Sequence, residues 1–238
     1  MKRILKRAMA VALTAVMLLA VAPLSGIADF ITTAQAAGGY KVGDTLYFGR
    51  YPQSEITDSF IKTEIVQNDE AENGLISYNG NLYYREGKRI FEYAPIQWRV
   101  LSVANDGIYI MSEKVLDRKK YNSSYTGITW ADCTLRTWLN GYFYNLAFSS
   151  SEKQAIQTTR LINENNSDYG TSGGIDTYDR VWIPSYSDVT NKACGFLNNS
   201  TRQKKAQTTA KRFIGGFALP VVIVVMCAVS ITTAMSTI

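Results

Sequence analysis

The 238-residue sequence predicts an α+β domain, rich in β-hairpins and with two or three short helices, followed by a C-terminal transmembrane helix. Three observations predict this class. Turn-forming residues separate short runs of β-branched and aromatic residues. Apolar residues recur at helical spacing after Thr129. An uncharged apolar segment, residues 213–235, is long enough to cross a bilayer.

The strands are predicted from alternation and from the residues that join them. The dipeptide Asn79-Gly80 favours a tight type I′ turn and therefore a hairpin. The triplet Asn105-Asp106-Gly107 has equally strong turn chemistry and predicts a second hairpin. The predicted strands are residues 45–48, 75–78, 81–84, 96–103, 108–111 and 181–183.

The helices are predicted from a hydroxyl residue followed three positions later by an acid, which is typical of a capped start. These pairs are Thr129 with Asp132, Ser149 with Glu152, and Ser185 with Asp188. After the first pair, one apolar face carries Leu135, Trp138, Leu139, Tyr142, Phe143 and Leu146. Residues 163–176 are polar and rich in Gly, so we expect a long loop there.

The N-terminal segment has the order of a secretory signal. Four basic residues precede an apolar run from Ala8 to Leu24, and small residues follow at Ala34 and Ala36. We therefore predict a signal peptide over residues 1–36 and an exported protein. The alternative is an uncleaved N-terminal anchor.

The C-terminal segment is predicted to be a membrane anchor. Residues 213–235 would span the bilayer as a helix, because membrane helices tolerate a proline such as Pro220. Residues 201–212 would be a basic juxtamembrane segment that contacts anionic lipid or wall polymer. This placement conflicts with the preference of basic residues for the cytoplasmic side. The expected partners are the membrane and a cell-wall or surface glycan or protein, and not nucleic acid.

Composition limits the chemistry of the body, residues 37–200, which we expect to be one extracytoplasmic domain. The body carries 16 basic and 19 acidic residues, so its net charge is −3, and residues 201–238 add +5. The sequence has no histidine, which excludes Ser-His-Asp and Cys-His catalysis as usually built and the common zinc sites that contain histidine. No nucleotide or hydrolase fingerprint occurs. We therefore predict a protein that is not an enzyme.

Three groups of residues are candidates for function. The aromatic residues Tyr121, Tyr125, Trp130, Tyr169 and Tyr178 lie in or near predicted loops and could stack on a sugar, or they could simply pack. The oxygens of Asn163, Asn165, Asp168, Asp176 and Asp179 could bind calcium, or they could bond their own turns. No other cofactor is expected.

Two further side-chain pairings have open alternatives. Cys133 and Cys194 could form a disulfide after export, or they could be two buried free thiols. Arg136, on the main helix, is expected to pair with a buried carboxylate, either Asp176 or Asp179, in a structural role.

Four ordered motifs resemble one known family. They are residues 43–54, 95–101, 130–149 and 173–182. Together they resemble the bacterial domain-of-unknown-function family 6273 over about residues 40–200. The resemblance implies an exported or surface module with a fold similar to C-type-lectin-like or formylglycine-generating-enzyme-like domains. It transfers no catalytic residue.

The C-terminal end departs from the family pattern. The continuation that is usual in the family is missing after Arg202, so the last core strands are expected to be absent and a sheet edge to be open. The function predicted is a cell-surface binding module for a glycan or a peptide, held at the membrane. The alternatives are an enzyme of the lectin-like superfamily and a truncated, non-functional remnant.

Overall fold

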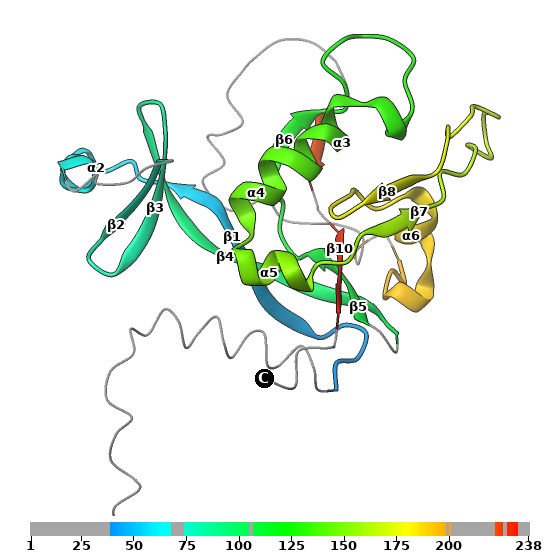
Figure 1. Ribbon diagram of the computed structural model, residues 1–238, viewed down its shortest axis with the longest axis horizontal. Coiled ribbons are helices and arrows are strands. Elements are labelled where there is room, and N and C mark those ends of the chain that lie inside the picture. Colours follow the sequence, from blue (N-terminus) through cyan, green and yellow to red (C-terminus); the bar gives the residue numbers. More distant parts are fainter. Residues whose placement is uncertain are drawn as a thin grey trace, which may run out of the picture.

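A central antiparallel sheet of six strands organises the molecule (Figure 1). The computed structural model describes residues 39–67, 74–104, 107–198, 200, 222–225 and 228–232; in the last two stretches Ile231 is the one residue whose side chain is described. The strands are β1 (Thr45–Glu55), β2 (Leu75–Tyr78), β3 (Asn81–Glu86), β4 (Arg89–Val103), β5 (Gly107–Ser112) and β10 (Ala228–Thr232). Their order is β10-β5-β4-β3-β2, and β1 also pairs with β4.

Both predicted hairpins are confirmed. Asn79 and Gly80 have φ angles of 49° and 75°, as a type I′ turn requires, and they join β2 to β3. Strand β4 pairs with β5 from Trp98 opposite Ser112 to Val103 opposite Ile108. At 15 residues, β4 is long enough to pair with three other strands in turn.

Strand β1 continues past the point where it was expected to end. Its register with β4 shifts twice, between Tyr47 and Arg50 and again between Pro52 and Glu55. Gly49 sits in the first irregularity with φ of 68°, where a Cβ atom would lie 2.7 Å from the ring of Phe148. These bulges accommodate a glycine and a proline that would otherwise end the strand.

Short helices cover one face of this sheet, as Figure 1 shows. α3 (Thr134–Trp138), η3 (Leu139–Phe143) and α4 (Tyr144–Ala147) form one continuous run, preceded by the 3₁₀ turn η2 (Trp130–Asp132). The predicted apolar face is confirmed in part: Leu135, Leu139 and Phe143 are buried in the main core, which also contains Trp98 and Val100 of β4.

The predicted helix starts have different outcomes. Ser149 caps α5 (Ser150–Ala155) and Ser185 caps α6 (Tyr186–Thr190), each by a complete capping box. The predicted cap at Thr129 is wrong, because Thr129 makes no side-chain cap and Cys133 Sγ instead accepts the Arg136 amide at 3.4 Å. The expected strand at 181–183 is also wrong, since the nearest strand, β8 (Thr177–Asp179), ends earlier.

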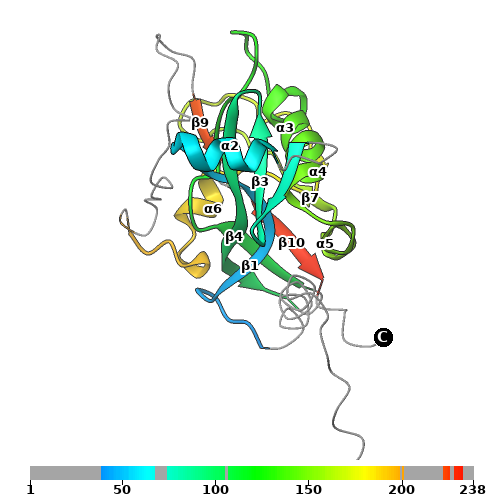
Figure 2. The same ribbon diagram turned by 90° about the vertical axis from the view of Figure 1, so that its left-hand side faces the viewer.

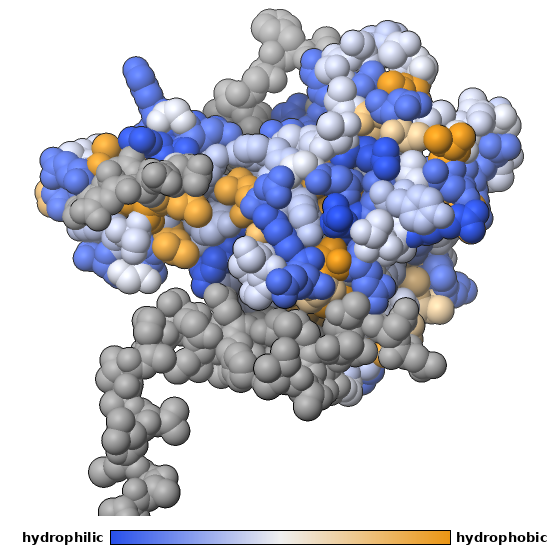
Figure 3. All heavy atoms as spheres, in the orientation of Figure 1, coloured by the Kyte–Doolittle hydropathy of each residue, from blue (hydrophilic) through white to orange (hydrophobic). Residues whose placement is uncertain are grey.

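The hairpin β2–β3 and the helix α2 (Ser59–Gln67) extend from the main body in Figure 1, and α2 and β3 face the viewer in Figure 2. Ile65, Ile76 and Ile90 form a small separate core beneath this helix. An apolar groove of about 500 Å³ lies between this extension and α4, and it is lined by residues that include Leu75, Leu82 and Leu146. Orange residues gather in this region of the surface in Figure 3.

The predicted transmembrane helix over residues 213–235 is wrong where the structure describes this segment. Strand β9 (Val222–Val225) pairs with β6 (Asp117–Lys120), and β10 pairs with β5. Within the described residues, no helix is both long and apolar enough to cross a membrane. The physical reason is that a run of Val, Ile and Thr suits a buried strand as well as it suits a membrane helix, and hydrophobicity alone does not separate the two.

The pairing of β10 also concerns the sheet edge that was expected to be open. Strand β10 covers the edge of β5, and Ile231 is 1% exposed within the main core. Ile231 also forms a bridge with Ile156 next to α5. The predicted signal peptide, residues 1–36, and the basic segment, residues 201–212, lie outside the described residues.

We predict that Ile231→Ala lowers the free energy of unfolding of the purified chain by about 3 kcal/mol, because it removes a buried side chain from a packed core. Urea denaturation followed by tryptophan fluorescence measures this loss. The matched control is Ile175→Ala, a side chain that is 74% exposed. Equal stability of the two variants would show that residues 228–232 do not complete the sheet.

Candidate functional site

A two-stranded ribbon carries the loop that forms one wall of the site. Strand β7 (Thr159–Leu161) pairs with β8, from Thr159 opposite Asp179 to Leu161 opposite Thr177. The predicted loop between them is confirmed, and its own amides shape it. The side chain of Asn163 donates to the Ile175 carbonyl at 2.7 Å, and Asn165 accepts the Gly173 amide at 3.0 Å.

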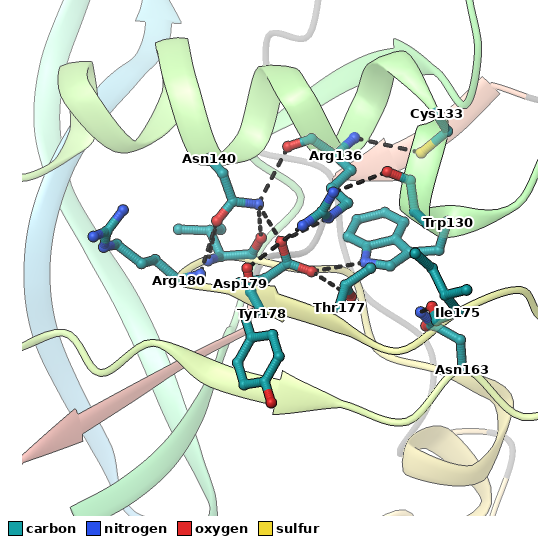
Figure 4. A network of polar contacts seen from close by, with 12 residues as sticks. Trp130, Cys133, Arg136, Asn140, Asn163, Ile175, Thr177, Tyr178, Asp179 and Arg180 are labelled. Carbon is teal, nitrogen blue, oxygen red and sulfur yellow. Dashed lines mark hydrogen bonds and ion pairs between the residues drawn. The ribbon is translucent and has the colours of Figure 1, made fainter.

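The carboxylate of Asp179, 2% exposed, attaches this ribbon to the helical layer (Figure 4). One oxygen accepts hydrogen bonds from the indole nitrogen of Trp130 at 2.9 Å and the hydroxyl of Thr177 at 2.8 Å. The other accepts from Arg136 Nε at 2.7 Å and Asn140 Nδ2 at 3.2 Å. Four donors therefore satisfy one buried charge, as a buried charge requires.

Asn140 extends the network beyond the carboxylate. Its side-chain oxygen accepts the backbone amides of Arg180 at 2.8 Å and Val181 at 3.1 Å, and its nitrogen donates to the Val181 carbonyl at 2.9 Å. The chain after β8 is therefore attached to η3. The predicted pairing of Arg136 is confirmed with Asp179, whereas Asp176 pairs with Arg160 at 2.7 Å.

A cleft opens where Trp130, the ribbon loop and the start of α6 meet. It consists of two adjoining cavities of about 430 and 540 Å³. The residues that line both are Tyr121, Trp130, Ile162, Asn163, Glu164, Ser185 and Ser187. We call this site the ribbon cleft.

The predicted aromatic residues divide between the ribbon cleft and other surfaces. Tyr121 and Trp130 line the cleft, with ring centroids 6.5 Å apart. Tyr125 is 100% exposed and Tyr169 is also highly exposed, and neither lines the cleft. Tyr178 lines a separate cavity of about 320 Å³ beside Arg136.

Sequence reasoning missed three aromatic residues of the ribbon cleft. Tyr109 and Trp182 line the larger cavity, and their rings stack at 5.5 Å with an angle of 10° between planes. Tyr186 lines the smaller cavity and is 75% exposed. Tyr186 follows the helix cap Ser185, so the capping signal could have placed it at a loop end, whereas Tyr109 lies within a predicted strand and gave no signal.

The predicted calcium residues are also divided. Asn163, Asn165 and Asp168 line the smaller cavity. Asp176 and Asp179 are instead ion-paired with arginines. In the described part of the chain, no group of three or more acidic or cysteine residues is arranged to hold a metal ion. Calcium binding through asparagine oxygens stays a prediction.

Burial raises the pKa values of two phenols that line the cleft. It raises the pKa of Tyr109 far above the ordinary value, and the nearby carboxylate of Asp188 raises it further. Burial likewise raises the pKa of Tyr121, and the adjacent thiol of Cys133 adds to the effect. An ordinary phenol is already protonated at neutral pH, and the raised pKa values extend that state to more alkaline solution.

Cys133 and Cys194 are free buried thiols and form no disulfide with each other. Cys133 lies in the main core, and Cys194 lies in a separate cluster with Leu101, Met111 and Phe196. Burial raises the pKa of both thiols, which lowers the fraction of reactive thiolate.

Comparison with known proteins gives one match. Residues 105–214 match the model of a family described as Domain of unknown function (DUF6273). This confirms the resemblance for the motifs at 130–149 and 173–182, whereas the motifs at 43–54 and 95–101 lie outside the match. The match includes all residues of the ribbon cleft and the Asp179 network. No curated protein and no solved structure matches the chain. The likeness to C-type-lectin-like domains therefore stays a prediction.

We predict that Asp179→Ala lowers the free energy of unfolding by about 3 kcal/mol, because it leaves the buried indole N–H of Trp130 without an acceptor and removes the carboxylate partner of the partly buried Arg136 guanidinium. The matched control is Asp176→Ala, which removes the partly exposed Arg160 pair and should cost less than about 1 kcal/mol. Urea denaturation of both variants measures the difference. A loss of similar size in both would contradict the structural role of Asp179.

We also predict slow alkylation of Cys133 and Cys194 in the folded protein. A Cys227→Ser variant restricts the measurement to these two thiols. At pH 8, both should react with a maleimide far more slowly than after unfolding in urea, because burial limits access and raises their pKa values. Rapid modification of either thiol in the folded state would contradict this environment.

Proposed function

We propose that this chain, whose residues 105–214 match the DUF6273 family model, is an exported binding module that holds a saccharide in the ribbon cleft. A single observation carries the proposal. Three segments that are separate in sequence bring aromatic rings together with amide and hydroxyl groups around one cleft of the size that small ligands occupy.

The chemistry of the lining matches that of a sugar. Tyr121 and Tyr186 present ring surface, on which the C–H face of a pyranose can stack. Asn163, Asn165 and Ser187 line the same cavity and can exchange hydrogen bonds with sugar hydroxyls. An aromatic platform beside convergent polar groups favours a ligand that is apolar on its face and polar around its edge.

The site is also held in place before any ligand arrives. The bond from Trp130 to Asp179 fixes the indole, and the amides of Asn163 and Asn165 fold the loop opposite it. A wall that is already ordered loses little conformational entropy on binding. This rigidity supports a binding role over a truncated remnant without a ligand.

The buried thiols weigh against the enzyme alternative. A cysteine oxidase needs accessible thiolates, and burial raises the pKa values of Cys133 and Cys194. We propose export because the N-terminal residues have the order of a secretory signal. An exported chain would present the ribbon cleft to wall and surface glycans.

We predict that the purified chain binds at least one saccharide class on a glycan array and that Tyr186→Ala weakens this binding about 5-fold. Loss of one stacking ring corresponds to about 1 kcal/mol. Calorimetric titration with the best array ligand measures the affinities. Tyr125→Ala is the matched control, because Tyr125 is an exposed tyrosine outside the cleft. Equal losses in both variants, or no binding at all, would refute the proposal.

A further inference from the structure

The two cavities of the ribbon cleft have different linings. Loop residues with short polar side chains, among them Asn165, Ser167 and Ser172, line the smaller cavity and are absent from the lining of the larger one. Leu161, Ile183 and Pro184 line the larger cavity and are absent from the lining of the smaller one. One end of the cleft therefore offers hydrogen bonds, and the other end offers apolar contact.

The apolar wall is accessible to a ligand. Ile162 lines both cavities and is 69% exposed, and Leu161 and Ile183 are only partly buried against the main core. Apolar surface that a ligand removes from water contributes to affinity in proportion to its area. A ligand that fits this wall therefore carries an apolar group of its own.

A hydrogen-bond acceptor lies beside this wall. Glu164 is exposed and lines both cavities, as does its near neighbour Ile162. Within the described part of the chain, the side chain of Glu164 makes no hydrogen bond and no ion pair. Its carboxylate is thus available to accept a hydrogen bond from an N–H or O–H group of a ligand.

The size of the cleft indicates a ligand of more than one unit. At about 430 and 540 Å³, each cavity by itself lies within the range that small ligands occupy. The two adjoin, because seven residues line both of them. A ligand that fills the whole cleft therefore has at least two parts joined end to end.

We infer that the ribbon cleft binds a chain of at least two N-acylated amino sugars. One sugar lies in the smaller cavity, against Tyr186 and the polar loop. The next places its acyl methyl group against Ile162, Leu161 and Ile183 and donates its amide N–H to Glu164. This inference rests on the proposed saccharide-binding function and names its ligand class.

The acylamino group supplies both of the features that the larger cavity calls for. It carries a methyl group for the apolar wall and a neutral N–H donor for the carboxylate of Glu164. A plain hexose has hydroxyl groups only and leaves the apolar wall in contact with water. A deoxy sugar has a methyl group, but it lacks the adjoining N–H.

The first test is calorimetric titration of the purified chain with an N-acetylglucosamine tetramer, its monomer, and a glucose tetramer of the same linkage. We expect the acetylated tetramer to bind about 10-fold more tightly than either of the other two. A glucose tetramer that binds equally well would overturn the acyl assignment, and a monomer that binds equally well would overturn the two-unit assignment. If these probes fail while another saccharide binds on the array, this inference alone is wrong. If no saccharide binds at all, the proposed function is wrong.

The second test uses two exposed isoleucines of the same ribbon loop. Ile162→Ser removes the apolar side chain that lines both cavities and should weaken binding of the acetylated tetramer about 5-fold, as expected for loss of one or two methyl contacts. Binding of the glucose tetramer should change less than about 2-fold. Ile175→Ser is the matched control, because Ile175 is 74% exposed and lines neither cavity. Equal affinities of the two variants for the acetylated tetramer, or equal losses for both tetramers in Ile162→Ser, would overturn the inference.

Discussion

The buried carboxylate of Asp179 connects the parts of the molecule on which the candidate site depends. Its partners come from the turn η2, from the helical run that follows it and from its own ribbon, and the first two precede Asp179 by about 40 to 50 residues in sequence. A buried charge is tolerated only where such partners surround it, so the network holds the segments in one arrangement. The position of Trp130, and with it one wall of the ribbon cleft, follows from this arrangement.

The C-terminal segment shows a second dependence, between sheet closure and core packing. Gly107 at the start of β5 lies against the backbone of Ile231, where a Cβ atom would collide with the carbonyl oxygen. This close approach lets β10 pair along β5 and brings Ile231 to the core. An edge that would otherwise offer unpaired amides and carbonyls to another chain is covered from within the same chain.

The ribbon cleft combines an ordered wall with a lining of aromatic and polar side chains. Its loop is folded by its own amides, and its indole is fixed by Asp179. Ordered walls that carry a few convergent polar groups are typical of sites that bind small ligands.

Local signals alone predicted several elements correctly. Asn79-Gly80 predicted its hairpin, the Ser149 and Ser185 boxes predicted their helices, and the spacing from Leu135 to Phe143 predicted the buried face. These succeed because turns, caps and amphipathic faces depend on residues that are neighbours in sequence. The same reasoning placed Arg136 beside a buried acid and Tyr121 and Trp130 among the ligand candidates.

Only the tertiary structure determined which secondary structure the C-terminal segment adopts and which residues form the ribbon cleft. The apolar segment 222–232 would suit either a bilayer or a buried sheet. Part of it is a strand because it pairs with the edge of β5. Tyr109 and Trp182 come from a strand and from the chain after the ribbon, and they meet because the sheet and the Asn140 contacts bring them together. Sequence determines the chemistry of each residue and its local conformation, but which distant surfaces meet depends on how the whole chain packs.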